Sequence, residues 1–287
     1  MSHTAGKIHP EVAEFRRQLA ETTAFLKERL AGFVPQVGVI LGTGMGKLAS
    51  KVETPTVISY HDIPHFPVST VESHEGRLVL GELGGKRVFM MQGRFHRYEG
   101  YSLKQVTYPV RVMKALGCER LVVMNAVGSM NPLIPAGSLV LVTDHINLMG
   151  DNPLIGPNDD ELGPRFPDMS QPYDREMIDT AFQAALANGL RVEKGVLVAV
   201  TGPNLETAAE YRAFRRMGAD LVTMSTVPEI TVAKHAGLRA MAISTVTDMC
   251  LPDDLHEAKL EEIIRIAGEA EPRLSALVIA LLERLKL

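Results

Sequence analysis

The sequence predicts an α/β fold: a single domain with a mixed, mostly parallel central β-sheet flanked by helices. Short runs of Val, Leu and Ile recur along the chain without the alternation of a strand that has one face in water, so both faces of the sheet should be covered. In the C-terminal half these runs alternate with segments of helical spacing, as in successive β-α-β units. We see no linker, repeat or low-complexity segment, so one domain over residues 1–287 is expected.

The N-terminal half begins with a predicted helix over residues 10–30, because apolar residues recur there at helical spacing with charged residues between them. Gly32 and Pro35 end this helix. The run 37–41 is a short buried strand that leads into a glycine loop, and we expect another helix after that loop. Later apolar runs predict strands at 57–60, 77–83, 86–91, 121–124 and 139–142, and helical spacing predicts a helix at 103–116.

Residues 150–173 form a long segment with five prolines. A connection of this length inside a compact domain is usually functional or part of an interface. Beyond it, periodicity predicts helices at 175–188, 207–217, 227–236 and 257–285, and strands at 195–200, 221–223 and 239–246. Pro272 is a place where the last helix could break.

Composition excludes several classes of function. The 30 basic and 34 acidic residues are nearly balanced and Trp is absent, which argues against a nucleic-acid partner. The two cysteines, Cys118 and Cys250, have neither metal-type nor C-x-x-C spacing and fit a reduced, cytoplasmic setting. The N-terminus lacks the apolar core of a signal peptide and no apolar run approaches membrane-spanning length, so no membrane partner is expected.

The densest group of polar side chains follows the apolar run Val88–Met91. Residues 92–101 read Q-G-R-F-H-R-Y-E-G-Y and place Arg94, His96 and Tyr98 directly after a buried strand. Ligands of α/β proteins bind outside the carboxyl ends of strands. Arg suits phosphate or carboxylate, and His exchanges protons near neutral pH. We therefore interpret this stretch as part of a ligand cleft rather than a solvated turn.

Other predicted strand ends carry further polar groups. The loop G-T-G-M-G at residues 42–46 can present backbone N–H groups to an anion, but its third glycine comes one residue too early for the dinucleotide fingerprint. His61 and His65 have metal-ligand spacing, yet Pro64 argues against a helix there, so no metal is expected. The remaining candidates are the anion binders Thr43, His74, Arg94 and Ser225 and the carboxylates Glu206 and Asp248. Their ligand would be anionic at one end and rich in hydrogen-bond donors at the other.

Taken in order, these motifs resemble the trimeric class of purine nucleoside phosphorylases. The matching pieces run from Gln36 to the C-terminal helix: G-T-G-M-G, H-E-G-R, M-Q-G-R-F-H-R-Y-E-G-Y, N-A, D-H-I-N-L, N-P-L-I-G-P-N-D, G-P-N-L-E-T and M-S-T-V-P-E. The resemblance implies the nucleoside phosphorylase fold and reversible phosphorolysis of purine (deoxy)ribonucleosides to free base and (deoxy)ribose 1-phosphate. It also implies a homotrimer that uses inorganic phosphate as co-substrate and no metal or organic cofactor.

The resemblance assigns roles position by position. It implies that His96, Glu206 and Asp248 are catalytic, with His96 between ribose and phosphate. The other implied roles are phosphate binding by Thr43, His74, Arg94, Ala126 (through its backbone) and Ser225; ribose binding by Tyr98 and Met224; base binding by Glu206, Asp248, Leu205 and Thr247; and contact with a neighbouring subunit by Leu162.

The departures from the family pattern all fall on the base and 5′ side. Asp248 replaces the Asn of oxopurine-specific members, and Leu205 and Leu162 stand where the family usually has Phe. The usual 5′-contacting His has no clear counterpart; Leu260 falls nearest, although His256 could reach in. An ionised carboxylate cannot donate to a 6-oxo group, so preference for 6-oxo or 6-amino purines stays open. The alternatives are a methylthioadenosine phosphorylase, which carries Asp at this place, a dinucleotide-dependent oxidoreductase and a non-catalytic nucleoside-binding protein.

Overall fold

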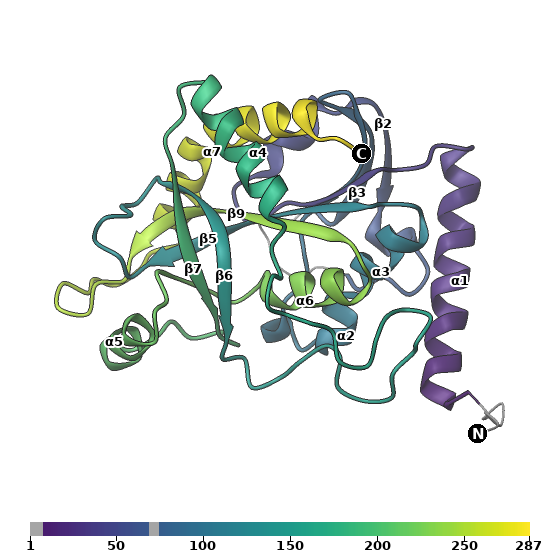
Figure 1. The fold of residues 1–287 in the computed structure, drawn as a ribbon, viewed down its shortest axis with the longest axis horizontal. Coiled ribbons are helices and arrows are strands. Elements are labelled where there is room, and N and C mark those ends of the chain that lie inside the picture. The colour runs from purple at the N-terminus through teal and green to yellow at the C-terminus, as the bar shows by residue number, and fades with distance from the viewer. Residues whose placement is uncertain (1–7, 69–74) are drawn as a thin grey trace.

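A mixed β-sheet forms the centre of the protein. The computed structural model describes residues 8–68 and 75–287, and within them nine strands follow the order β2-β3-β4-β1-β5-β8-β7-β6-β9 (Figure 1). The strands are β1 Val37–Ile40, β2 Glu53–Ser59, β3 Arg77–Leu83, β4 Lys86–Gln92, β5 Arg120–Ser129, β6 Leu139–Asn147, β7 Val192–Ala199, β8 Leu221–Thr223 and β9 Arg239–Met249. The predicted α/β fold with a mixed, mostly parallel sheet is confirmed.

Strand β5 is the junction of the sheet. It pairs in parallel with β1 on one side and with β9 on the other, and its last residues pair antiparallel with β8. β9 also pairs with β6, β6 with β7, and β7 with β8, so the five strands β5, β8, β7, β6 and β9 close into a ring. The strands β1, β4, β3 and β2 extend from β5 as an open arm of the sheet. Residues on β5 therefore lie where the ring meets the arm.

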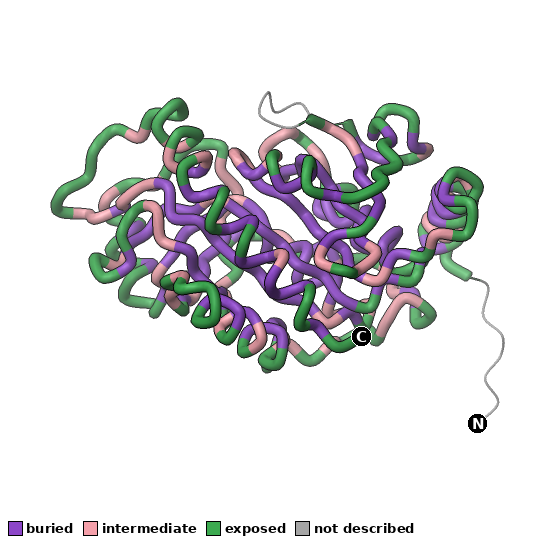
Figure 2. Tube along the Cα trace, turned by 90° about the horizontal axis from the view of Figure 1, so that it is seen from above, coloured by how far each residue is buried: buried purple, intermediate pink, exposed green. Residues whose placement is uncertain are grey.

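Helices cover both faces of the sheet. Helices α4 and α7 pack together on one face, α6 with α2 and α3 covers the other, and α1 lies outside α3 (Figure 1). Buried residues run along the strands in the middle of the molecule, while the outer sides of the helices and the loops are exposed (Figure 2). The helices are α1 Pro10–Leu30, α2 Leu103–Val106, α3 Tyr108–Ala115, α4 Arg175–Ala187, α5 Ala208–Arg216, α6 Val227–His235 and α7 Leu260–Arg284, with short 3₁₀ helices η1 Gly46–Lys51, η2 Tyr60–Asp62 and η3 Arg97–Glu99.

Local signals place the first helix at its predicted bounds. Its N-cap His9 accepts a hydrogen bond from the backbone N–H of Glu11, Pro10 occupies the first turn, and Ala31 ends the helix in a left-handed conformation before Gly32. Pro lacks the N–H that would be unsatisfied at this position in any case. None of the helices among the described residues is both long enough and apolar enough to span a membrane.

Three element predictions were wrong. The helix predicted at 103–116 is two helices that meet at Thr107, because Pro109 cannot donate to the carbonyl four residues earlier. The last helix does not break at Pro272, whose exposed ring sits within the continuous α7. The glycine loop is followed only by the 3₁₀ helix η1 and not by a regular helix.

Strands β5 and β9 are longer than predicted. The predicted strands ended at Met124 and Val246, where the apolar runs stop, but pairing continues to Ser129 and Met249. The two strands pair with each other along this extension, with one irregularity after Val127. Residues 125–129 and 247–249, which lie beyond the predicted strand ends, therefore belong to paired strands and not to loops.

We expect Gly268→Ala to raise the free energy of unfolding by about 0.5–1 kcal/mol. Gly268 lies inside α7, and an added Cβ would meet no atom within 4 Å. The gain comes from the entropy that Gly loses on folding, and urea unfolding measures it. The matched control is Gly44→Ala, which should be destabilising because Gly44 has a φ of 77° and its Cβ would lie 2.6 Å from that of Ala267. A loss of stability in Gly268→Ala would contradict the prediction.

Candidate functional site

Several strand ends open into one cleft of about 420 Å³. Strands β4, β1, β5 and β9 run parallel to one another, so their carboxyl ends lie at the same edge of the sheet, which is where α/β proteins bind ligands. The residues after β7 and β8 reach the same place. The lining residues are Gly42, Thr43, Arg94, His96, Tyr98, Asn125, Ala126, Val127, Gly128, Pro203, Leu205, Glu206, Tyr211, Val222, Thr223, Met224, Ser225, Thr247, Asp248, Cys250, Leu260 and Ile263.

The cleft brings together nearly all of the predicted site residues. Within the described part of the chain, each of them lines this cleft except Leu162. His74 lies outside the described residues. The eleven that meet here come from six separate stretches of sequence: Thr43; Arg94, His96 and Tyr98; Ala126; Leu205 and Glu206; Met224 and Ser225; and Thr247 and Asp248.

The glycine loop lets β1 approach β5 closely at the floor of the cleft. A Cβ on Gly42 would lie 2.9 Å from both Asn125 Cα and Met124 O, which are backbone atoms that cannot move aside cheaply. The first glycine of the loop is therefore required by packing, and it places Thr43 beside the carboxyl end of β5.

Arg94 is a buried cation at the centre of one side of the cleft, with only 2% of its surface exposed. Its Nη1 donates to Ser225 Oγ (3.1 Å) and Thr226 Oγ1 (3.2 Å), and its Nη2 donates to the carbonyl of Met124. Glu229 Oε1 lies 3.4 Å from Nη1 and is equally buried. Burial lowers the pKa of Arg94 and the Glu229 charge opposes that shift, so the carboxylate keeps the guanidinium charged inside the protein.

The ring of His96 is held from two directions. Glu99 Oε1 accepts from the His96 backbone N–H (2.8 Å) and lies 3.0 Å from its Nδ1. The imidazole also stacks on Tyr98, with ring centroids 4.6 Å apart and planes 12° apart. Burial raises the pKa of Tyr98 to about 12, so its phenol stays protonated and able to donate near neutral pH. Glu99 therefore orients the His96 ring without lining the cleft itself.

Two carboxylates occupy the opposite side of the cleft. Asp248 is held on β9, where its Oδ1 accepts from Thr247 Oγ1 (2.8 Å) and its Oδ2 accepts from the Cys250 thiol (3.2 Å). Glu206 follows β7, just before α5. Burial raises the pKa of Glu206, and the nearby Asp248 charge adds to the increase. A pair of carboxylates facing one cavity suits a ligand surface rich in hydrogen-bond donors.

Known proteins are similar to this chain in both sequence and fold. Residues 36–283 match the family described as the phosphorylase superfamily. "Purine nucleoside phosphorylase 1" of Bacillus subtilis is 54% identical over 231 residues, which cover 80% of this chain and 85% of that protein. The mouse purine nucleoside phosphorylase is 45% identical over 281 residues, covering 96% and 97% of the two chains. The chain belongs to the purine nucleoside phosphorylase family.

Solved structures of this family have the same fold. Isoform 2 of the Schistosoma mansoni purine nucleoside phosphorylase, in complex with cytosine and ribose-1-phosphate, superposes with a TM-score of 0.90 at 37% identity, covering 94% of this chain and 97% of that one. A Schistosoma mansoni purine nucleoside phosphorylase in complex with adenosine gives a TM-score of 0.90 at 38% identity, covering 94% and 98%. The family membership and the nucleoside phosphorylase fold expected from the motifs are confirmed.

Tyr211 and Cys250 line the cleft, but the sequence analysis did not assign them to the site. Burial, together with the nearby Cys250 thiol and Glu206 carboxylate, raises the pKa of the Tyr211 phenol. The Cys250 thiol also donates to the Asp248 carboxylate, so both residues belong to the carboxylate side of this phosphorylase-family cleft. Cys250 could have been found from the sequence, because residues two apart on a strand share a face. Tyr211 gave no such signal, since only the packing of α5 brings it to the cleft.

Leu162 lies in a different place from the other predicted residues. Its side chain packs against the core of its own chain and lines a second cavity, and its carbonyl accepts from Arg111 Nη1 (3.0 Å). Its contact with a neighbouring subunit stays a prediction. Of the two candidates for the 5′ contact, Leu260 lines the cleft, whereas His256 does not and pairs with Asp254 at the surface.

We expect Arg94→Met to lower the free energy of unfolding by about 3–5 kcal/mol, because it leaves the buried Glu229 carboxylate without its cation. Chemical denaturation measures the loss. The double variant Arg94→Met/Glu229→Gln is the control, since it removes the unpaired charge together with its partner. It should recover part of the lost stability, and a double variant no more stable than Arg94→Met alone would show that the pair does not stabilise the fold.

Proposed function

We propose that this protein catalyses the reversible phosphorolysis of purine ribonucleosides and deoxyribonucleosides. Inorganic phosphate would be the co-substrate, and free purine and (deoxy)ribose 1-phosphate the products. The observation that carries the proposal is the convergence of separate motifs on one cleft with a cation on one side and two carboxylates on the other. The proposed enzyme is one domain over residues 1–287 and needs no metal or organic cofactor.

The Arg94 side of the cleft is the proposed phosphate site. Arg94 supplies positive charge, Thr43 and Ser225 supply hydroxyl donors, and the backbone of Ala126 lies beside them. His74 completes the proposed group. Charge-assisted hydrogen bonds to an anion are roughly twice as strong as those between neutral groups. The hydroxyl of Ser225 is already aligned by Arg94, so little reorganisation is needed when phosphate binds.

His96, Tyr98 and Met224 are the proposed neighbours of the sugar. In the reaction a phosphate oxygen forms a bond to C1′ as the bond from C1′ to the purine breaks, and the electron pair of that bond passes to the base. The sugar ring becomes oxocarbenium-like at the transition state, so a phosphate held beneath it stabilises its positive charge. His96, fixed by Glu99 and by stacking on Tyr98, would bridge phosphate and ribose.

Glu206 and Asp248 are the proposed partners of the base, with Leu205 and Thr247 beside them. The departing purine gains negative charge and takes a proton at N7, so a group that donates to N7 lowers the barrier. Asp248 is the proposed partner of N7, and Glu206, whose pKa is raised by burial, is the proposed anchor of the base. A Schistosoma purine nucleoside phosphorylase was solved in complex with hypoxanthine and a Schistosoma mansoni one in complex with adenosine, so relatives of this fold bind both 6-oxo and 6-amino purines.

We propose that the protein is a cytoplasmic homotrimer, and the long segment 150–173 supports the homotrimer. It carries two of the exposed large apolar side chains, Ile155 at 62% and Phe166 at 87% exposure. Exposed apolar side chains of this size are typical of interfaces. We propose that this segment meets a neighbouring subunit and that Leu162 is the residue brought nearest to that subunit's cleft.

We expect release of free base from inosine, guanosine or adenosine only when inorganic phosphate is present. The assay incubates the full chain with each of these and with methylthioadenosine, with and without phosphate, and separates base from nucleoside by chromatography. Cleavage that ignores phosphate would exclude phosphorolysis. Cleavage of methylthioadenosine alone would favour the second candidate, a methylthioadenosine phosphorylase, which the Asp248 carboxylate supports.

We expect Asp248→Asn to raise the ratio of kcat/KM for inosine to that for adenosine by about tenfold or more. An Asn amide can accept from N7–H and donate to a 6-oxo group, whereas a carboxylate cannot donate. A lost or gained hydrogen bond of about 1.4 kcal/mol corresponds to a tenfold change. The matched control is Cys250→Val, which removes the thiol that donates to Asp248 Oδ2 but keeps the carboxylate. In Cys250→Val the ratio of kcat/KM for inosine to that for adenosine should stay close to the wild-type value. An unchanged ratio in Asp248→Asn would show that this residue does not contact the base.

A further inference from the structure

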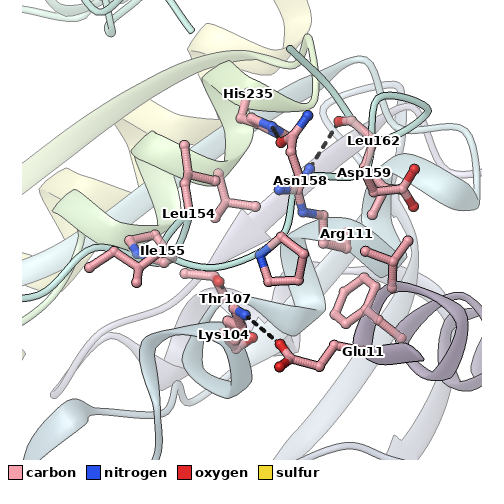
Figure 3. Close-up of a pocket in the computed structure, with 15 residues that line it drawn as sticks. Glu11, Lys104, Thr107, Arg111, Leu154, Ile155, Asn158, Asp159, Leu162 and His235 are labelled. Atoms are coloured by element: carbon pink, nitrogen blue, oxygen red, sulfur yellow. Dashed lines mark hydrogen bonds and ion pairs between the residues drawn. The ribbon is translucent and has the colours of Figure 1, made fainter. Parts of the chain in front are cut away.

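A second cavity, of about 110 Å³, lies on the side of the protein where α1, α3 and α6 meet residues 153–162 (Figure 3). It shares no lining residue with the cleft described above. About half of its lining is apolar, formed by Val12, Phe15, Leu154, Ile155, Leu162 and Val232 with two prolines. The other lining residues are polar and include the carboxylates Glu11 and Asp159. For comparison, an apolar cavity of about 150 Å³ binds benzene; this cavity is smaller, so it has room for a short chain or for a single ring that lies partly at its mouth.

A buried cation faces this apolar space. Arg111 of α3 is 9% exposed and lies among the lining residues, with its bond to Leu162 marked in Figure 3. Only Nη1 of its guanidinium donates to an acceptor, the carbonyl of Leu162 at 3.0 Å. Among the residues that the structure describes, Nε and Nη2 of Arg111 have no hydrogen-bond partner, and neither is sealed from solvent.

Among the described residues Arg111 has no ion pair of its own, although the Asp159 charge acts on it. The nearest carboxylate in its electrostatic surroundings is Asp159, which Arg16 already engages through two hydrogen bonds of 2.8 and 2.5 Å. No carboxylate in the described ranges, residues 8–68 and 75–287, forms an ion pair with Arg111 within 4 Å. Burial lowers the pKa of Arg111 to about 10, so the group is still charged at neutral pH. A buried charge is costly unless it is paired.

The other polar lining groups do not offer a competing anion site. His235 is 4% exposed, and burial together with the Arg111 charge lowers its pKa to about 4, so it is neutral near pH 7. Its Nε2 lies 3.3 Å from Asn158 Oδ1. Lys104 is at the rim, 3.7 Å from Glu11, and is half exposed. Arg111 is thus the one buried cation among the described residues that line the cavity.

We propose that this cavity binds a small monocarboxylate with a single ring or short apolar chain. The carboxylate would accept from the Nε and Nη2 edge of Arg111, because the guanidinium fork matches two carboxylate oxygens. The apolar body would pack against Phe15, Leu154 and Val232. Inorganic phosphate fits less well, since a dianion facing one buried cation would leave several of its oxygens without donors. Because the same guanidinium holds Leu162, the ligand also stabilises the fold of residues 153–162.

Benzoate tests the proposal on the full chain, with binding followed by isothermal titration calorimetry and by the shift in Tm. We expect saturable binding of benzoate, about tenfold weaker or undetectable binding of the neutral benzyl alcohol, and benzoate binding that persists in saturating phosphate. Arg111→Met should weaken benzoate binding at least tenfold. The matched control is Arg120→Met, since Arg120 is also 9% exposed but bonds to Lys286 at another place on the surface, and it should bind benzoate as the wild type does.

A second variant keeps the test decisive if Arg111→Met does not fold. Val232→Phe narrows the cavity from α6 without touching Arg111, and it should abolish benzoate binding while far-UV circular dichroism stays unchanged. The proposal is overturned if wild-type protein does not bind benzoate, if benzyl alcohol binds equally well, or if Arg111→Met or Val232→Phe binds as wild type. Loss of benzoate binding in saturating phosphate would place the benzoate in the main cleft and would also overturn it. None of these results depends on whether the cleft performs phosphorolysis.

Discussion

The buried guanidinium of Arg94 is the interaction on which the architecture of the cleft depends. It joins the end of β4 to the backbone of β5 at Met124 and to Ser225 and Glu229 at the start of α6. A single side chain thereby ties three elements that are far apart in sequence. The Glu229 carboxylate offsets the cost of burying the cation, and breaking such a pair is far more costly than never having formed it. The charge that would face phosphate is therefore part of the folded core and not a mobile surface group.

The strand arrangement separates the two sides of the cleft. β5 belongs to both the arm and the ring, and its extension beside β9 keeps Ala126 and Asp248 on one paired ladder. The cationic side is built around Arg94 and the carboxylate side around Glu206 and Asp248, so the ligand that we propose, anionic at one end and donor-rich at the other, would be oriented before any chemistry begins. Pre-orientation of this kind is a large part of catalysis in bimolecular reactions. Hydrogen bonds from Thr247 and Cys250 hold the Asp248 carboxylate in place, and Tyr211 lines the cleft with Glu206.

Arg94 and Arg111 are both buried cations, but they differ in the number of groups that they contact. Arg94 has hydroxyl, carbonyl and carboxylate partners from several elements. Arg111 has one carbonyl partner and an apolar cavity in front of it, while the adjacent Asp159 is held by Arg16. Since the protein interior does not screen charge as water does, the second arrangement favours an anionic ligand. The same contact to Leu162 connects this cavity to the long segment that we propose lies at the subunit interface.

The sequence by itself determined the α/β class, the bounds of most helices and strands, the family, and half of the residues that line the cleft, eleven of 22. It could do so because apolar periodicity and short polar motifs are local, and because the carboxyl ends of parallel strands meet at one edge of a sheet. It ended β5 and β9 too early, since strand pairing beyond Met124 and Val246 depends on partners distant in the chain. Only the tertiary structure paired Arg94 with Glu229, brought Tyr211 to Glu206, and left Arg111 facing a cavity. Those contacts join residues separated by five to more than a hundred positions, and no local spacing encodes how helices pack around a buried charge.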